Sequence, residues 1–373
     1  AKGDRCQGQP TFDRLVHGEH VAAVVGAYES TVTLQALIAA DKRNVPLVND
    51  SATAPSLTQP GGSITACGRT DADPRPSQWF FRVGPSDTQA ARQFFNLIDD
   101  AAVADKIRQV RRVAILHESD DIYGNTGAAA TQRLAKSHDI TVKSFGYRTV
   151  LGRPAPSSDS SCAIKTELVA QLRSLVQEIK AYRPDVVFAL GYLPDAVATV
   201  QTMQELGYVP PALLAYGAGF VDGAFIPGVK AGSPLCGLPP ADPAGIIARA
   251  AWSPDLSSAT PTARHVAELF KQRYKRPMTH TSASAFTAML TLAQAINKAG
   301  STNPAKIRKA LGALDVPANE TIMPWAGIKF DLHGQNKRAD VVLQQIRGGS
   351  YRVVYPTSVS TREAVWPLAK ARR

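Results

Sequence analysis

Hydroxyl and tyrosine side chains follow several short apolar runs of this 373-residue chain. GAYES follows VAAVV, NDSAT follows VPLV, and GY follows VVFAL. Hydroxyl groups and exposed backbone N–H groups can bind a carboxylate, and tyrosine faces can cover an apolar or aromatic body. A single hydroxyl at a helix start is more often an N-cap than a ligand contact. The repetition nevertheless favours a binding site for a small organic acid, with these candidates: Tyr28, Ser30, Ser51, Ala52, Thr53, Tyr123, Tyr192 and Tyr216.

The motifs of common enzyme classes are missing from the sequence. It contains no GxSxG, HExxH or GxxxxGK[ST] motif, and GAGFVDG at 217–223 lacks the last glycine of the dinucleotide fingerprint. His17 and His20 lie three residues apart, but no further ligand pattern accompanies them, so surface positions are favoured over a metal site. We therefore expect no catalytic residues, no metal and no cofactor.

The elements that would position the candidates alternate between strand and helix. Apolar runs predict strands at 21–25, 45–48, 113–116, 186–190 and 213–216. Helical patterns follow at 31–42, 125–136, from 166 to about 182, and 195–206. Such alternation is typical of parallel sheets with helices on both faces. Ligands of open parallel sheets bind beyond the carboxyl ends of the strands, where the candidate residues lie.

The last third of the chain has a different pattern. Helices are expected at 262–274 and 284–299, and Asn303 with Pro304 predicts the N-cap and first turn of another. Shorter strands are expected at 328–330, 341–346 and 351–354, the last two forming a hairpin through GlyGlySer. Two Pro- and Ser-rich stretches, 151–161 and 231–243, are expected to be surface insertions.

Composition sets limits on the class of protein. The length suggests two domains, and no apolar run approaches the length of a membrane span. The formal net charge of +11 is scattered without an aromatic-interleaved basic stripe, which argues against a nucleic-acid partner. The four cysteines are far apart, so two disulfides in an oxidising compartment and four free thiols both remain open at this stage.

A series of landmarks gives the chain a resemblance to a known family. VVGAYES, VPLVNDSATAPSLTQ, FFRVGPSDTQAA, VAILHESDDIYG, RPDVVFALGYLPDA and GIKFDLHGQ occur in the order found in the type I solute-binding proteins of ABC transporters. The match is to the branched-chain amino-acid (Leu/Ile/Val) receptor group of periplasmic binding proteins. This resemblance implies an α/β fold of two Rossmann-like lobes joined by three crossovers. The implied division is 1–86 with 255–327 for lobe 1, 87–254 with 328–356 for lobe 2, and 357–373 for a C-terminal tail.

The resemblance also implies roles for the candidate residues. Ser30, Ser51, Ala52 and Thr53 would hold the carboxylate of a solute from the first lobe, and Tyr123 and Tyr192 would cover it from the second. Trp252, near the second crossover, is expected either to form an aromatic wall or to pack at the hinge.

The family's ammonium-binding glutamate has no counterpart in the stretch AlaTyrGlyAlaGly at 215–219. An ammonium group buried without a carboxylate partner would be costly. Either Asp222, Asp121 or Glu29 therefore substitutes for the glutamate, or the ligand has no amine.

The implied biology is that of a receptor rather than an enzyme. It would bind an amino acid, 2-oxo acid or aromatic carboxylate by hinge closure and deliver it to a membrane permease. A ligand-sensing regulatory domain of the same fold is the alternative. We expect a monomer in the periplasm or another extracytoplasmic location, with a lipid anchor as one variant.

Lobe membership, as implied by the resemblance, pairs the cysteines as Cys6 with Cys67 and Cys162 with Cys236. The family also begins with a strand, a helix and a second strand that have no counterpart here, so we expect an N-terminal segment to be missing from the sequence.

Overall fold

The chain folds into two compact units that interleave along the sequence. The computed structural model describes residues 5–59, 64–66, 69–71, 77–103, 109–149, 161–233 and 237–368. Unit 1 comprises Ala1–Asp87, Asp121–Thr126 and Leu256–Val341. Unit 2 comprises Thr88–Asp120, Gly127–Asp255 and Val342–Arg373. Residues 328–341, assigned by the sequence analysis to the second lobe, lie in unit 1, and residues 357–368 lie in unit 2.

Unit 1 contains a short parallel sheet in the order β1-β2-β5. The strands are β1 (Val24–Val25), β2 (Leu47–Asn49) and β5 (Phe80–Arg82). Leu47 pairs with Val24 on one side and with Phe80 on the other. Two further strands, β3 (Ile64–Ala66) and β4 (Arg69–Asp71), form a separate antiparallel pair.

Helices cover both faces of this sheet. Alternation along a strand sends neighbouring side chains to opposite faces. Leu47 and Phe80 accordingly join one buried cluster with Phe12 of α1 and Leu34 of α2. Val48 and Phe81 join another with residues of α9 and α10. The helices of unit 1 are α1 (Gly8–His17), α2 (Ser30–Arg43), α8 (Pro261–Tyr274), α9 (His280–Ala299) and α10 (Pro304–Gly312), with short 3-10 turns η1 (Arg5–Gln7), η2 (Pro55–Leu57) and η6 (Ala318–Glu320).

Unit 2 is built on a seven-stranded sheet in the order β12-β11-β10-β9-β8-β6-β7. The five strands from β10 to β7 are parallel to one another, whereas β11 and β12 pair antiparallel at one edge. The bounds are β6 (Arg112–Glu118), β7 (Thr141–Tyr147), β8 (Val186–Leu190), β9 (Leu213–Tyr216), β10 (Ile247–Ala250), β11 (Val342–Arg347) and β12 (Ser350–Tyr355).

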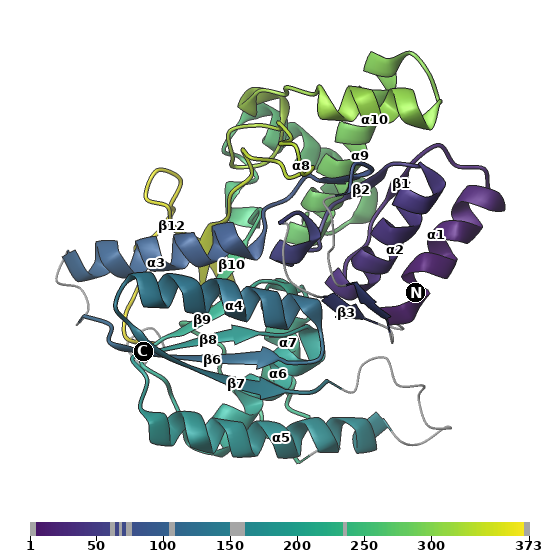
Figure 1. Cartoon of the computed structure of the whole chain (residues 1–373). Helices are drawn as coiled ribbons and strands as arrows, with labels where there is room; N and C mark the ends of the chain where they lie inside the picture. Colours follow the sequence, from purple (N-terminus) through teal and green to yellow (C-terminus); the bar gives the residue numbers. More distant parts are fainter. Residues whose placement is uncertain are drawn as a thin grey trace. The chain divides into compact units, whose positions relative to one another are not determined.

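The helices of unit 2 lie on both faces of its sheet (Figure 1). They are α3 (Asp87–Val103), α4 (Ile122–Ser137), α5 (Ser161–Tyr182), α6 (Leu193–Glu205) and α7 (Phe225–Ala231), with 3-10 turns η3 (Ala218–Val221) and η5 (Pro254–Leu256). The first residue of α3, the first five residues of α4 and the last residue of η5 belong to unit 1. Helices α3 and α4 lie on one face, and α5 lies on the other (Figure 1). Phe94 and Phe95 of α3 pack on Phe188 of β8, with ring centroids 5.5 and 5.7 Å apart. Aromatic packing thus fixes α3 against the middle of the sheet.

The predicted strand at 328–330 is wrong. The segment makes only isolated bridges, between Val316 and Ile328 and between Phe330 and Asn336. Gly327 at φ +105° and Gly334 at φ +72° bend the backbone on either side, which prevents a continuous ladder. Phe330 instead packs edge-on against Phe81, with a centroid distance of 5.2 Å, and so belongs to the core of unit 1.

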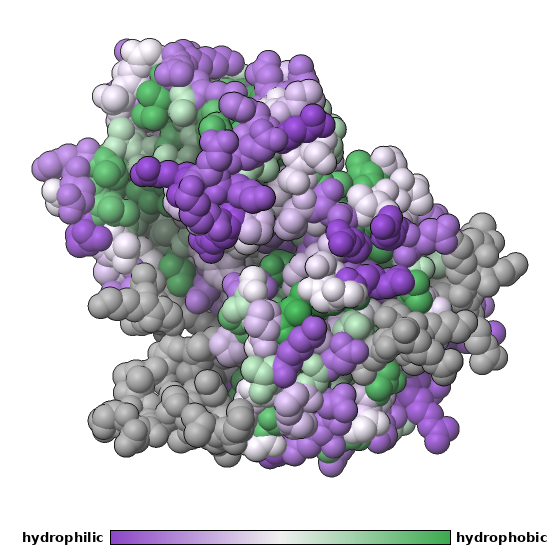
Figure 2. Space-filling model, turned by 180° about the vertical axis from the view of Figure 1, so that it is seen from behind, coloured by the Kyte–Doolittle hydropathy of each residue, from purple (hydrophilic) through white to green (hydrophobic). Residues whose placement is uncertain are grey.

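Among the described residues, no helix is both long enough and apolar enough to cross a membrane. On the face shown in Figure 2, hydrophilic residues predominate and hydrophobic ones occur in groups between them.

Candidate functional site

The carboxyl end of β2 in unit 1 gathers polar side chains. Asn49, the last residue of β2, is fully buried. Its Nδ2 donates to the carbonyl oxygens of Gly26 and Ala27 at 3.1 and 2.9 Å, which ties the ends of β1 and β2 together. The side-chain oxygen of Asn49 has no hydrogen-bond partner among the described residues.

The loop after β2 carries three of the predicted residues and contacts a fourth. Thr53 Oγ1 donates to Asp87 Oδ2 at 3.0 Å, and the Asp87 amide donates back to the Thr53 carbonyl at 2.9 Å. Ser30 Oγ, at the start of α2, accepts from the Ala54 amide at 3.3 Å. The structure therefore brings Ser30 together with the loop of Ser51, Ala52 and Thr53, as the sequence pattern predicts.

A buried arginine supports this loop from within unit 1. Arg82 is 1% exposed, and its Nη1 donates to the Ala54 carbonyl at 2.7 Å. Its Nε donates to Gln335 Oε1 at 2.6 Å, and its Nη2 donates to Thr58 Oγ1. Charge-assisted hydrogen bonds of this kind are strong and directional. The sequence analysis missed Arg82, and no motif marks it.

Acceptor and hydroxyl oxygens remain unpaired around the end of β2. Asp50 Oδ1 and Ser51 Oγ are buried and have no hydrogen-bond partner among the described residues. Burial raises the pKa of Asp50 above its usual range. Buried polar atoms without partners are uncommon in native proteins and suggest that a ligand or water completes the site.

Tyr123 lies in unit 1, whereas the sequence analysis placed it in the second lobe. It is 1% exposed, and its amide donates to Asp121 Oδ1 at 2.7 Å. Asp121 Oδ2 accepts from Thr31 Oγ1 of α2 at 2.7 Å. Because Ile122 also packs into the cluster around Phe12, residues 121–126 are held by unit 1. Tyr28 is 41% exposed.

In unit 2, the predicted aromatic residues lie at the carboxyl ends of strands β8, β9 and β10. Tyr192, the N-cap residue of α6, is 6% exposed, and its amide donates to Asp195 Oδ2 at 3.4 Å. Tyr216 is fully buried, with its hydroxyl 2.6 Å from Thr131 Oγ1 and its ring 5.2 Å from that of Phe94. Trp252 is 1% exposed, and its Nε1 has no hydrogen-bond partner among the described residues.

Beside Tyr216 the structure places a residue that the sequence analysis did not consider. Arg249 of β10 is 3% exposed, and its guanidinium lies against Gly217. The only available sequence signal was a single arginine inside the otherwise apolar run GIIARAAW.

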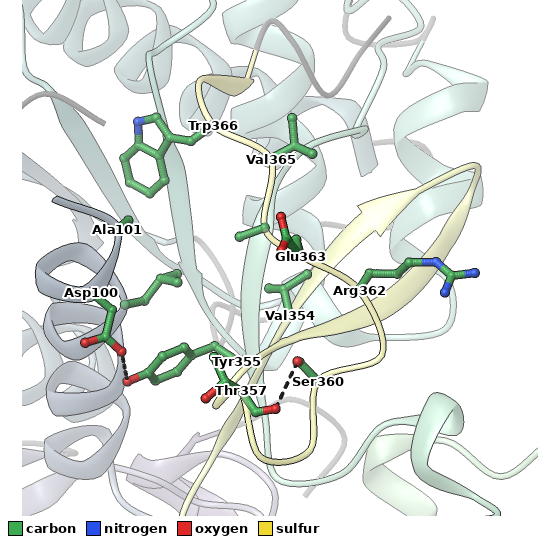
Figure 3. Close-up of a pocket in the computed structure, with 12 residues that line it drawn as sticks. Asp100, Ala101, Val354, Tyr355, Thr357, Ser360, Arg362, Glu363, Val365 and Trp366 are labelled. Carbon is green, nitrogen blue, oxygen red and sulfur yellow. Dashed lines mark hydrogen bonds between the residues drawn. The ribbon is translucent and has the colours of Figure 1, made fainter. Parts of the chain in front are cut away.

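A cavity of about 780 Å³ lies elsewhere in unit 2. It is lined by α3, β12 and the segment after β12, including Leu97, Asp100, Tyr355 and Trp366 (Figure 3). The Tyr355 hydroxyl donates to Asp100 Oδ2 at 2.9 Å across one side of it. A smaller apolar cavity of about 280 Å³ lies beside α5, α6 and α7. None of the nine predicted ligand residues lines either cavity.

Within the described ranges, no group of three or more His, Cys, Asp or Glu side chains could hold a metal ion. His17 and His20 are exposed. Cys6 is disulfide-bonded. Cys67, Cys236 and the side chain of Cys162 lie outside the described residues, so the predicted pairs Cys6–Cys67 and Cys162–Cys236 stay predictions.

Two α/β units with polar, hydroxyl-rich strand ends are typical of proteins that bind small solutes. A family model described as "Periplasmic binding protein" matches residues 2–350. The chain therefore belongs to the periplasmic binding protein family, and the resemblance to its type I branched-chain amino-acid group is confirmed. These relatives are solute-binding receptors rather than enzymes.

Named relatives place the chain more closely within that family. It is 24% identical over 364 residues to Leu/Ile/Val-binding protein homolog 7 of Brucella abortus (strain 2308), covering 95% of this chain and 79% of the relative. It is 26% identical over 367 residues to Leu/Ile/Val-binding protein homolog 8 of Brucella suis biovar 1 (strain 1330), and the match covers 96% of this chain and 79% of the relative.

Solved structures share the fold. A leucine-binding protein from Thermotoga maritima matches with a TM-score of 0.69 and 19% identity, over 94% of this chain and 83% of that one. A solute-binding protein of an ABC transporter from R. palustris, in complex with benzoate, matches with a TM-score of 0.66 and 15% identity, over 94% and 82%.

Proposed function

We propose that the chain is the extracytoplasmic receptor of an ABC transporter and that it binds a small carboxylate-bearing solute. The solute would lie in a cleft between the two lobes, which would close around it by a hinge motion. The receptor would then deliver the solute to a membrane permease. No bond is made or broken in this mechanism, since binding only shifts the population toward the closed state.

The observation that carries this proposal is the polar cluster at the carboxyl end of β2. Ser51 Oγ is buried without a partner among the described residues, so its hydroxyl can donate to a carboxylate. Ser30 Oγ accepts a hydrogen bond from the Ala54 amide of the same loop. Thr53 already donates its proton to Asp87, so toward a solute its hydroxyl oxygen acts as an acceptor.

The aromatic residues would cover the apolar part of the solute. Tyr123 in unit 1 and Tyr192 in unit 2 each follow a polar turn at a strand end. The ring of Trp252 would add a further aromatic wall. Its buried indole N–H has no partner among the described residues and could donate a hydrogen bond to the solute. Tyr28 and Tyr216 complete the proposed set.

The comparisons support a small organic acid as the solute but do not identify which acid it is. Fold neighbours were solved with leucine, isoleucine and benzoate. We propose the class of amino acids, 2-oxo acids and aromatic carboxylates.

A ligand screen tests the proposal directly. The chain would be assayed by thermal shift and calorimetry against leucine, valine, 4-methyl-2-oxopentanoate and benzoate, with an uncharged amide of each acid as the control. Binding of at least one acid but not of its amide is expected. Small-angle scattering should then show a smaller radius of gyration with the bound acid. If no acid in the panel binds, the proposed receptor function for small carboxylates is wrong.

A further inference from the structure

The larger cavity of unit 2 has the size and lining of a ligand site. Its volume of about 780 Å³ is within the range of pockets that bind small molecules. Its lining residues come from α3, the end of β12 and the segment after β12, so unit 2 alone forms it. Half of the lining is apolar: Leu97, Ala101, Val354, Ala364, Val365 and Trp366. An apolar cavity with a few polar groups is the usual form of a small-molecule site.

The wall that carries Trp366 is anchored on both sides of this residue. The Val365 amide donates to Gln345 Oε1 at 3.0 Å, and Gln345 Nε2 donates to the Val365 carbonyl at 2.8 Å. Gln345 is fully buried in β11. Beyond Trp366, the Leu368 amide donates to the Pro211 carbonyl at 2.8 Å. These bonds hold Trp366 in place although it is partly exposed, so the wall is formed before any ligand binds.

Helix α3 presents a carboxylate to the same cavity. Asp100 is exposed, and the Tyr355 hydroxyl donates to its Oδ2 at 2.9 Å (Figure 3). Tyr355 is 8% exposed, so this bond fixes the direction of the carboxylate. Within the described part of the chain, no other group donates to the Asp100 carboxylate. A carboxylate accepts up to about four hydrogen bonds, so Asp100 can still accept one from a ligand.

The charges around the cavity favour a cation as the ligand. Asp100 and Glu363 are the acidic residues of the lining, and Arg362 is the basic one. The Arg362 guanidinium points away from Asp100 and Trp366 (Figure 3), and its Nη1 donates to the Thr361 carbonyl at 3.1 Å. An anion near Asp100 would be repelled, whereas an ammonium group could donate a charge-assisted hydrogen bond to it. The face of the Trp366 indole also attracts a cation.

We propose that this cavity is a second ligand site and that it binds an organic ammonium ion with an aromatic or apolar body. The ammonium group donates to the Asp100 carboxylate, and the body packs against Trp366 and Val354. The site differs from the proposed solute site in its residues and in the charge that it prefers. Because unit 2 alone forms it, binding there requires no closure of the lobes.

The test compares tryptamine with tryptophol, which has the same indole body and a hydroxyl group in place of the ammonium. In calorimetry the unmodified chain should bind tryptamine about tenfold or more tightly, because a hydrogen bond to a charged group is worth about this much. Asp100→Asn should lower the affinity for tryptamine about tenfold and change that for tryptophol little. Trp366→Leu should lower both affinities about threefold or more, because an aromatic contact is lost.

Asp99→Asn is the matched control. Asp99 is the neighbouring exposed acid of α3, its Oδ2 lies 3.3 Å from His138 Nδ1, and it does not line the cavity. This variant should bind tryptamine as the unmodified chain does. Failure of the unmodified chain to bind tryptamine, or equal affinities for tryptamine and tryptophol, would overturn the inference. Undiminished binding of tryptamine by the Asp100→Asn chain would overturn it as well. None of these outcomes affects the proposed receptor function, because the Asp100→Asn chain should bind the acids of the panel unchanged.

Discussion

At the scale of single residues, Ser30 connects the start of α2 to the loop that follows β2. Its Oγ accepts from the buried Ala54 amide at 3.3 Å. We expect Ser30→Ala to weaken solute binding by about two- to tenfold, because one hydrogen bond of about 0.5 to 1.5 kcal/mol is lost. Calorimetry with the acid that gives the largest thermal shift would measure this change.

Ser137→Ala supplies the control for Ser30. Ser137 is an exposed residue at the end of α4, where its hydroxyl donates to the Leu134 carbonyl at 2.8 Å. Its removal should leave solute affinity unchanged. Equal affinities of the Ser30→Ala chain and the unmodified chain would contradict the role assigned to Ser30.

The sequence predicted some residues of the site better than others. The position of Ser30 beside the loop of Thr53 could be predicted because hydroxyls after buried strands of a parallel sheet converge on one edge, and the binding role of both residues stays a prediction. Arg249 could not be found, since only the pairing of β10 with β9 brings it to Gly217. Tyr216 was predicted as a ligand contact, and that role stays a prediction. Its ring packs on Phe94 and its hydroxyl meets Thr131, contacts that depend on how α3 and α4 cover the sheet.

At the scale of elements, the start of α10 depends on one side chain. Asn303 Oδ1 accepts from the amides of Ala305 and Lys306 at 3.0 and 3.2 Å, as predicted for an N-cap followed by proline. Asn303→Ala should lower the free energy of unfolding by about 1 kcal/mol. Asn303→Asp, which keeps an acceptor at the cap, should be close to neutral. Urea unfolding of both variants would measure this, and a neutral alanine variant would contradict the capping role.

The segment after β12 is held by Asp255. Its carboxylate accepts from Arg352 Nη1 at 2.9 Å, from the Val353 amide at 3.1 Å and from the Thr361 hydroxyl. Burial alone would raise the pKa of Asp255, but these hydrogen bonds and the charge of Arg352 outweigh burial and lower it. A carboxyl group with a lowered folded pKa stabilises the fold above its unfolded pKa of about 4, and this contribution is lost as the pH falls through the folded pKa.

Asp255→Asn should therefore destabilise the chain at pH 7 by about 1 to 3 kcal/mol, because hydrogen bonds to a charged acceptor are lost. The difference from the unmodified chain should shrink as the pH falls below about 4, where the unfolded chain takes up a proton, and should vanish only below the lowered folded pKa, where both chains carry a neutral group. Chemical unfolding at pH 7, 5 and 3 would measure it. Asp139→Asn, an exposed change at a positive φ that asparagine tolerates, is the control and should change the free energy of unfolding at pH 7 little. If Asp255→Asn lowered the free energy of unfolding as much at pH 3 as at pH 7, the stabilising role assigned to the Asp255 carboxylate would be contradicted.

Elements with strong periodicity were predicted well, and those defined by tertiary pairing were not. The strands at 186–190 and 213–216 match β8 and β9 because they are apolar on both faces. The hairpin of β11 and β12 is also confirmed. β7 was missed because TVKSFGY alternates between exposed and half-buried positions along much of its length. Its strand conformation depends on pairing with β6, which no local pattern reveals.

At the scale of the whole molecule, each unit is assembled from chain segments that are distant in sequence. Unit 1 combines segments from the first quarter and from the last third of the chain. Arg82 Nε donates a hydrogen bond to Gln335 Oε1 although the two residues are more than two hundred positions apart. The segment 328–341 could not be assigned to this unit from sequence, because the hydrogen bonds of Arg82 and the packing of Phe330 on Phe81 attach it there.

This division argues for the cysteine pairing, which is the last prediction. Cys6 and Cys67 fall within the residue ranges of unit 1, and Cys162 and Cys236 fall within those of unit 2. A bridge that joined the units would resist the proposed hinge closure, so we expect pairs within each unit. Peptide mapping by mass spectrometry without reduction should recover Cys6–Cys67 and Cys162–Cys236. Reduction should lower the unfolding temperature, because a cross-link restricts the unfolded chain, while leaving the solute-induced decrease in radius of gyration intact. Recovery of a Cys67–Cys162 peptide would contradict both the pairing and the independence of the two units that closure requires.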